Sequence, residues 1–310
     1  MKLVSFVIPC YRSAATVGAV VEEIDAAMAA LPDYEHEVIL VNDCSPDDTF
    51  AVISSLAREK DHVTAVDLSR NFGQHAALMS GLRHSRGDIA VCLDDDGQTP
   101  ADQVGRLLSK LEAGFDVVYA SYPRKRQPSF RRLGTRLNGR MTEVMLSKPR
   151  DLELTSYFAA RRFSVEEMLS YEHCFPYVMG LVLRSTKNIC NVPVDHRQRE
   201  QGRSGYSLGK LLSLWMNGVT SFSIKPLRLA TYLGALTALA GFVYAIVIVV
   251  RYFAVHMAPL GWSSTTALLL VLGGAILLVL GLVGEYVGRI FMCVNASPQY
   301  VEREVIDGRK

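Results

Sequence analysis

Along residues 1–206, short apolar runs alternate with longer stretches in which apolar residues recur three or four positions apart. The first pattern is typical of buried strands and the second of amphipathic helices. The predicted strands are 3–8, 37–41, 63–68, 89–93, 116–120, 156–160 and 189–194, and the predicted helices are 16–30, 50–60, 74–84, 101–113 and 165–171. Strands that alternate with helices of this length predict an α/β fold, Rossmann-like, with a mostly parallel sheet covered by helices on both faces.

The C-terminal part of the chain has a different pattern, with two long apolar stretches. The 22 residues 229–250 and the 28 residues 257–284 contain no Asp, Glu, Lys or Arg. A helix needs about 20 predominantly apolar residues to cross a bilayer. We therefore expect two C-terminal transmembrane helices, at about 229–252 and 266–290.

Two further segments favour contact with a membrane surface. Residues 124–140 hold seven basic residues and no acidic one, and Arg132, Arg136 and Arg140 recur every four positions. This spacing predicts a basic amphipathic helix at about 124–146, which suits the anionic lipids of an inner leaflet. The alternative is a solvated helix face. A second interfacial helix is expected over 207–225.

These patterns predict four parts of the chain. Residues 1–206 would form a cytoplasmic domain, 207–225 a juxtamembrane helix, 226–291 the two spans and 292–310 a cytoplasmic tail. The loop between the spans carries one Arg and one His, whereas several Lys and Arg flank the other ends of the spans. The positive-inside rule then places both termini in the cytoplasm.

The amino-acid composition excludes few classes of function. The formal net charge is +2, so charge alone indicates no partner, and we expect no nucleic-acid partner. The six cysteines are scattered without C-x-x-C spacing, which is typical of buried thiols in a reducing compartment. No G-x-G-x-x-G follows the first predicted strand, which argues against a dinucleotide site.

An acidic stretch follows the strand predicted at 89–93. Asp94, Asp95 and Asp96 stand together there, before Gly97 and Pro100. Side chains alternate along an extended strand, so Asp94 and Asp96 should converge. Converging carboxylates are hard oxygen ligands that suit Mg²⁺ or Mn²⁺ beside a phosphate-bearing substrate. A solvated acidic turn is the alternative.

Polar residues follow other predicted strands as well, at Pro9 to Tyr11 and at Asp43. In parallel sheets, ligands bind beyond the carboxyl ends of the strands, so these groups should share one crevice with Asp94. A loop after residue 194 carries a histidine and three arginines within eight residues. Arginine is well shaped for phosphate. An ordinary charged surface loop is the alternative.

The motifs resemble, nearly end to end, those of the membrane-bound polyprenyl-phosphate glycosyltransferases of glycosyltransferase family 2, which have a GT-A fold. The chain looks most similar to the branch of dolichyl- and undecaprenyl-phosphate sugar transferases, which includes formamido-arabinose transferases. The segments that carry the resemblance are 7–11, 41–47, 70–75, 94–100, 196–206 and 282–289. Each motif is weak alone, but six in this order are specific.

The resemblance implies roles for particular residues. Pro9, Tyr11 and Asp43 would bind the nucleotide, and Asp94 would contact it or the metal. Asp96 would be the main ligand of Mg²⁺ or Mn²⁺, with Gln98 nearby, so that Asp94, Asp96 and Gln98 are the candidate catalytic residues. The residues implied for binding the lipid phosphate are Arg131, His196, Arg199, Arg203 and Ser204. Some family members are homotetramers, which implies a homo-oligomer.

The implied activity is inverting transfer of a sugar from a nucleotide-sugar, expected to be UDP-linked, to polyprenyl phosphate such as undecaprenyl phosphate. It would take place at the inner leaflet of a bacterial plasma membrane. One departure concerns Ser156, which stands where many relatives have Asp. An acceptor phosphate is largely ionised at neutral pH and needs no strong base, so we expect activity to persist.

Two other functions are alternatives. A processive polysaccharide synthase usually has several spans and a Q-x-x-R-W motif, and this sequence has two predicted spans and no such motif. A catalytically silent membrane scaffold that binds nucleotide-sugar has only Ser156 in its support.

Overall fold

The computed structural model describes residues 1–122, 149, 151–195 and 261–309, together with short helical runs of one to four residues between 227 and 250. The chain divides into two compact units. One comprises Met1–Gly218 and Ala296–Lys310, and the other comprises Val219–Asn295.

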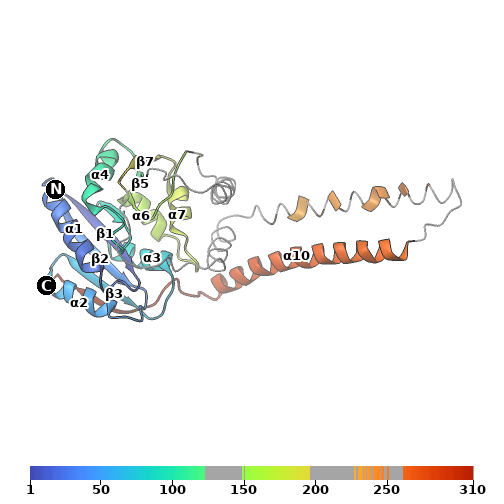
Figure 1. The fold of residues 1–310 in the computed structure, drawn as a ribbon, viewed down its shortest axis with the longest axis horizontal. Coiled ribbons are helices and arrows are strands. Elements are labelled where there is room, and N and C mark those ends of the chain that lie inside the picture. Colours follow the sequence, from blue (N-terminus) through green and yellow to red (C-terminus); the bar gives the residue numbers. More distant parts are fainter. Residues whose placement is uncertain are drawn as a thin grey trace. The chain divides into compact units, whose positions relative to one another are not determined.

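The described part of the first unit contains an eight-stranded sheet with the order β7-β5-β6-β4-β1-β2-β3-β8 (Figure 1). Its strands are β1 Lys2–Cys10, β2 Tyr34–Asn42, β3 Val63–Leu68, β4 Ile89–Cys92, β5 Val117–Ser121, β6 Phe158–Arg161, β7 Ile189–Pro193 and β8 Glu302–Asp307. Strands β4, β1, β2 and β3 are parallel neighbours, and so are β5 and β7. Strand β6 runs antiparallel to β4 and β5, and β8 runs antiparallel to β3. The α/β prediction is confirmed, and the sheet is mixed.

Helices cover both faces of this sheet. They are α1 Val17–Ala29, α2 Thr49–Glu59, α3 Gln74–His84, α4 Val104–Glu112, α6 Arg162–Leu169 and α7 Val178–Ser185, with a short 3₁₀ turn, η1, at Ala101–Gln103. Side chains along β2 alternate between the two faces of the sheet. On one face, Val38 and Leu40 belong to the hydrophobic core that α1, α2 and α4 cover. On the other face, a Cβ added at Gly81 would collide with Val7, so glycine lets α3 lie close to the sheet.

Strand β8 adds the end of the chain to the edge of the sheet, beside β3. No element was assigned to this segment from the sequence, which predicted 292–310 only as a tail. Glu302 accepts hydrogen bonds from Ser80 Oγ at 2.7 Å and pairs with His84 Nε2 at 3.1 Å, both on α3. The C-terminal segment is therefore part of the first unit and contacts the helix that follows β3.

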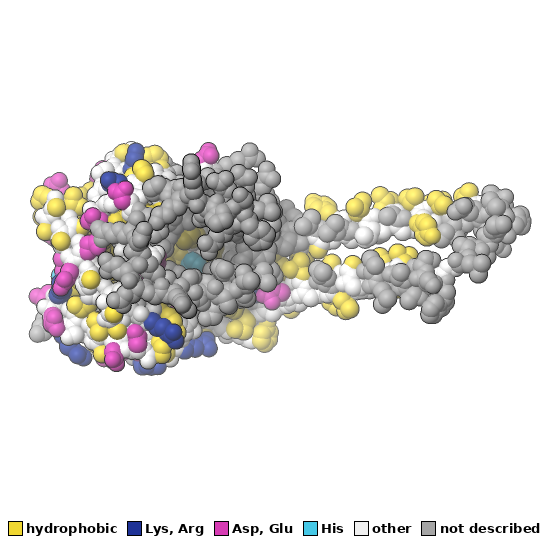
Figure 2. Space-filling model, viewed as in Figure 1, with side chains coloured by type: hydrophobic (Ala, Val, Ile, Leu, Met, Phe, Trp, Pro, Cys, Tyr) yellow, Lys and Arg dark blue, Asp and Glu magenta, His cyan; other side chains and the backbone are white. Residues whose placement is uncertain are grey.

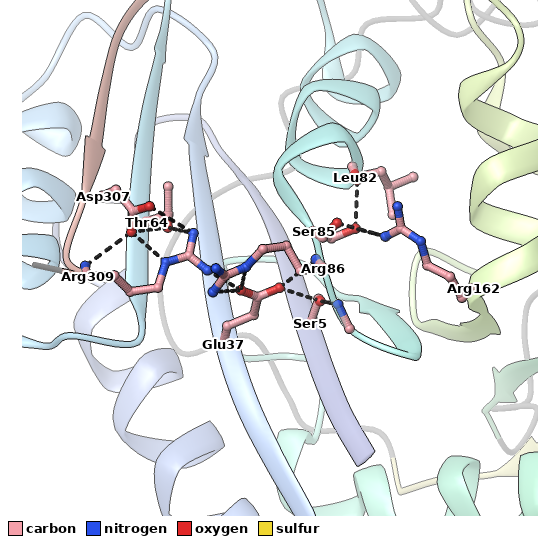
Figure 3. Close-up of polar contacts among 10 residues, drawn as sticks. Ser5, Glu37, Thr64, Leu82, Ser85, Arg86, Arg162, Asp307 and Arg309 are labelled. Atoms are coloured by element: carbon pink, nitrogen blue, oxygen red, sulfur yellow. Dashed lines mark hydrogen bonds and ion pairs between the residues drawn. The ribbon is translucent and has the colours of Figure 1, made fainter. Parts of the chain in front are cut away.

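The buried carboxylate of Glu37 forms an ion pair with Arg309, which follows β8 (Figure 3). Glu37 on β2 is 4% exposed and accepts hydrogen bonds from Ser5 Oγ and the backbone N–H of Arg86, each at 2.7 Å. Arg309 Nη1 approaches the same carboxylate at 2.7 Å and its Nε bonds Asp307 Oδ1 at 2.7 Å. A buried carboxylate needs such partners, since an unpaired one would be costly.

The second unit contains the long helix α10, Trp262–Val294. Within it, the 23 residues Leu272–Val294 are long and apolar enough to cross a membrane, and this is the one such helix among the described residues. Hydrophobic side chains run along its described part (Figure 2). Near its end, Glu285 Oε1 and Arg289 Nη2 pair at 2.7 Å, one helical turn apart.

Of the two predicted spans, the described residues therefore contain one. The other, at about 229–252, falls where only short runs of one to four residues are described. The basic helix predicted at about 124–146 and the interfacial helix predicted at 207–225 lie outside the described residues.

We predict that Gly308→Ala destabilises the first unit by about 1–3 kcal/mol, the usual range for overpacking. A Cβ at this position would meet the backbone carbonyl oxygens of Ala57, Lys60 and Val63, which cannot rotate away. Thermal unfolding of the full chain in detergent, followed by circular dichroism, measures the change. Gly18→Ala is the matched control, because nothing lies within 4 Å of its Cβ position in α1. Equal unfolding midpoints for the two variants would contradict the prediction.

We predict that Glu302→Gln costs about 1 kcal/mol of unfolding free energy at pH 7. Burial works to raise the pKa of Glu302, but hydrogen bonds from His84 and Ser80 outweigh it and hold the pKa below its usual value. A lowered carboxyl pKa gives stability that is complete above the unfolded pKa and is lost as pH falls through the folded one. The gap between wild type and variant should therefore close in acid.

Urea unfolding of the full chain across a pH series measures this gap. Glu304→Gln, an exposed residue on the same strand, should change stability by less than about 0.5 kcal/mol at every pH. A gap for Glu302→Gln that does not change with pH would contradict the assignment.

Candidate active site at the carboxyl edge of the sheet

Loops that follow the four parallel strands β1 to β4 carry residues predicted to bind the nucleotide and the metal, at the carboxyl end of the sheet. Because these strands are adjacent and parallel, their carboxyl ends lie together. Pro9 lies within β1 opposite Val41, and Tyr11 follows β1 with 46% of its surface exposed. Asp43 follows β2, and Asp94 follows β4. The four residues therefore lie at the same end of neighbouring strands, and that they share one crevice stays a prediction.

Asp94 is held by two neutral donors from distant parts of the chain. Gln74 Nε2, at the start of α3, donates to Asp94 Oδ1 at 2.9 Å, and Ser156 Oγ donates to Oδ2. Burial raises the pKa of Asp94 to about 6, and the charges of Asp96 and Asp95 act in the same direction. The two hydrogen bonds work against this rise. An ionised Asp94 is therefore costly in the protein alone, and a cation beside it would relieve the cost.

Asp95 ties the end of β4 to the loop after β1. Its Oδ2 accepts the backbone N–H of Tyr11 at 3.1 Å and the hydroxyl of Ser13. Burial raises the pKa of Asp95, while these two hydrogen bonds oppose the rise. Asp95 therefore fixes the backbone next to Tyr11.

Asp96 lies in the bend after β4, and its Oδ1 accepts the backbone N–H of Gln98 at 3.1 Å. Its charge acts on Asp94, so the two predicted metal ligands are electrostatic neighbours. Carboxylate oxygens are the donors that Mg²⁺ and Mn²⁺ prefer, so this donor set fits such an ion.

Asp43 organises the next loop. Its two carboxylate oxygens accept the backbone N–H groups of Phe72 at 2.7 Å and Gly73 at 2.9 Å, and its backbone oxygen accepts Asn71 Nδ2 at 3.2 Å. Burial raises the pKa of Asp43, opposed by the two backbone hydrogen bonds. Gly73 has φ +92°, which favours glycine, and it leads directly into Gln74. Asp43 thereby helps to set where Gln74 reaches Asp94.

The backbone of the first two loops is in the left-handed region at two non-glycine residues. Arg12 has φ 60° and Cys44 has φ 50°. Ser45 Oγ accepts the N–H of Arg12 at 3.1 Å, which joins the two loops. Such conformations are uncommon and gather at functional sites.

The residues expected to bind lipid phosphate lie outside the described part of the chain. They are Arg131, His196, Arg199, Arg203 and Ser204. Their predicted position beside the acidic cluster therefore stays a prediction.

Sequence reasoning missed several contacts within the site. It gave no role to Ser13, and it included Gln74 only within a motif. It singled out Ser156 without a partner, although this hydroxyl contacts Asp94. Tyr122 was also missed: burial raises its pKa to about 12, with a further rise from Asp94. The Arg70–His75 motif was the one signal that could have pointed to Gln74.

Comparison with known families gives two matches. Residues 5–169 match glycosyl transferase family 2, and residues 225–290 match the GtrB C-terminal hairpin.

Curated relatives match over nearly their whole length. The undecaprenyl-phosphate 4-deoxy-4-formamido-L-arabinose transferase of Klebsiella pneumoniae is 33% identical over 309 residues, covering 99% of this chain and 94% of that protein. The enzyme of the same name from Yersinia enterocolitica is 34% identical with the same coverage.

Solved structures share the fold. Glucosyl-3-phosphoglycerate synthase from Mycobacterium tuberculosis, in complex with Mn²⁺, UDP-glucose and phosphoglyceric acid, is 20% identical with a TM-score of 0.52. The match covers 71% of this chain and 78% of that one. The family match, the full-length relatives and this fold agree with the resemblance carried by the sequence motifs, and the chain belongs to glycosyltransferase family 2.

Proposed function

We propose that this glycosyltransferase moves a sugar from a nucleotide-sugar, a UDP-sugar in our proposal, to undecaprenyl phosphate. The observation that carries the proposal is the carboxylate cluster Asp94–Asp96 at the carboxyl edge of the sheet. It occurs in a chain that matches undecaprenyl-phosphate sugar transferases over 99% of its length.

We propose Asp94 and Asp96 as the residues that would hold Mg²⁺ or Mn²⁺, with Gln98 beside them. The raised pKa of Asp94 supports this, because burial and the neighbouring charges of Asp96 and Asp95 make its ionised form costly without a cation. A fold relative was solved with Mn²⁺ and UDP-glucose. When bound, such an ion neutralises charge that develops on a leaving diphosphate.

The main role of the other described side chains would be to orient Asp94 and the loop after β1. Gln74 and Ser156 hold Asp94 by its two oxygens, and Asp95 fixes the loop that carries Tyr11. Pro9, Tyr11 and Asp43 are proposed to line the nucleotide site. In this inverting transfer, an acceptor phosphate oxygen bonds the anomeric carbon from the face opposite the breaking bond to the nucleotide diphosphate. The acceptor is already ionised, so a serine at position 156 is compatible with the reaction.

The proposed setting is the cytoplasmic face of a bacterial inner membrane. The match of residues 225–290 to a C-terminal hairpin supports two spans, of which α10 contains one candidate. The basic segment 124–146 would contact anionic lipids, and the lipid phosphate would meet Arg131, His196, Arg199, Arg203 and Ser204. A homo-oligomer, by resemblance a tetramer, is part of the same proposal.

No feature of the described residues favours a silent scaffold. Its support was Ser156, and this residue donates a hydrogen bond to Asp94.

The direct test is product formation. Membranes that contain the full chain should convert a radiolabelled UDP-sugar and undecaprenyl phosphate into a lipid-phosphate sugar, identified by mass spectrometry, and chelation should stop the reaction. Asp96→Asn should reduce the rate about 100-fold or more, because loss of an ion ligand costs several kcal/mol of charge stabilisation. Asp61→Asn, an exposed aspartate ahead of β3, should leave the rate unchanged. An unchanged rate for Asp96→Asn would exclude its assigned role.

Removing either donor to Asp94 should weaken the response to metal. Gln74→Ala and Ser156→Ala should each raise the half-saturating Mn²⁺ concentration about 10- to 100-fold, the usual cost of losing a partner of a metal ligand. The measurement is transfer rate against Mn²⁺ concentration. Ser109→Ala removes an exposed hydroxyl from α4 and should change nothing. If the two donor variants matched this control, Asp94 would not be held for metal binding by these contacts.

A further inference from the structure

Two histidines and an aspartate lie together near the amino ends of β2 and β3. Asp25 lies on α1, His36 lies in β2 and His62 directly precedes β3. Asp25 Oδ1 is 2.9 Å from His36 Nε2 and 2.9 Å from His62 Nε2. The three donor atoms lie within 4.8 Å of one another. None of them takes part in the site proposed above.

The position of this cluster separates it from the carboxylates. His36 is near the amino end of β2, whereas Asp43 follows the carboxyl end of the same strand. Six or seven residues of extended strand span about 20 Å, so the two groups are far apart. An ion held by Asp94 and Asp96 could not also contact His36.

The three side chains come from well-packed elements. Ile24 beside Asp25, and Val38 and Val63 near the histidines, are buried in the core. The His36 and His62 rings lie 4.8 Å apart at 62°, and His36 contacts the edge of Phe6 at 6.3 Å between centroids. The backbone N–H of Val38 also bonds the carbonyl oxygen of His62 at 2.9 Å. Both imidazoles are therefore placed by the β2–β3 pairing.

The distances suit a small ion. With bonds of about 2.0–2.2 Å in a tetrahedral zinc site, neighbouring donor atoms lie about 3.3 Å apart. The Asp25–histidine distances of 2.9 Å would need to open by only a few tenths of an ångström. The side chains of Asp25, His36 and His62 keep 27%, 20% and 32% exposure, which leaves room for water as a fourth ligand.

The charge of the Asp25 side chain also suits a metal ligand. An aspartate carboxylate is ordinarily ionised at neutral pH, as a metal ligand must be. Lys60 Nζ contacts the other oxygen, Oδ2, at 2.6 Å and can orient the carboxylate while Oδ1 binds an ion. Each neutral imidazole would carry its proton on Nδ1 and use the Nε2 lone pair.

We propose that Asp25, His36 and His62 form a second metal site, which takes a divalent transition ion of the Zn²⁺ type. Two imidazoles and one carboxylate are the donors that such ions prefer, whereas Mg²⁺ prefers oxygen alone. Bound there, the ion would join α1 to the β2–β3 pair.

The test is zinc binding by the full chain in detergent, prepared without a polyhistidine tag and stripped by a chelator. An Asp96→Asn background removes a proposed ligand of the other site. Calorimetric titration with ZnCl₂ should give one equivalent bound, and MgCl₂ should give none. His36→Gln and His62→Gln should each weaken zinc binding about 10-fold or more. His173→Gln, an exposed histidine in another loop, should leave it unchanged.

A second measurement removes any dependence on how the variants fold. X-ray absorption at the zinc edge of the loaded Asp96→Asn protein should show two imidazole ligands with oxygen completing the shell. The proposal is overturned by an absence of saturable zinc binding, by equal affinity in all three histidine variants, or by an absorption spectrum without imidazole.

Discussion

Repulsion among the three carboxylates after β4 is the constraint on which the site depends. Asp94, Asp95 and Asp96 crowd into a partly buried bend, where ionised groups are poorly solvated. Donors from the β1 loop, from the start of α3 and from the segment before β6 surround them. None of these donors carries a charge, so these contacts orient the carboxylates without neutralising them.

These contacts depend on the order of the strands in the sheet. The donors to Asp94 come from residues 20 and 62 positions away, and Ser13 reaches Asp95 across 82 positions. They meet only because β1 lies beside β4, and β6 pairs with β4 on the other side. At Ser156, an aspartate in place of the serine would add a fourth carboxylate next to Asp94. The hydroxyl instead supplies a donor, which reduces the repulsion.

Periodicity in the sequence predicted the elements well where the signal is local. Helix 74–84 was predicted with the bounds that the structure gives, and strand 63–68 likewise. The direction of β6 was not predictable, because a four-residue strand carries no information about its partner. Strand β8 was missed because its Glu-Arg-Glu-Val-Ile-Asp sequence has few apolar residues and pairs with a strand more than 200 positions away.

The same limit applies to the sites. The position of Asp94 and Asp43 at the same end of the sheet followed from the rule for parallel sheets, since both come shortly after strands. The contacts of Gln74 and Ser156 depend on side-chain direction and could not be inferred from spacing. Asp25, His36 and His62 are separated along the chain and belong to no motif, so only the packing of α1 on β2 brings them together.

Strand β8 also has a consequence for how the protein is made. Thr64 and Asp307, which pair across β3 and β8, are 243 positions apart, and the apolar helix α10 lies between them. During synthesis, β3 therefore stays an open sheet edge until the ribosome has passed α10 and β8 has been made. An open edge invites pairing with other chains. A nascent chain that stalls within α10 would carry every carboxylate of the cluster yet leave the β3 edge unpaired.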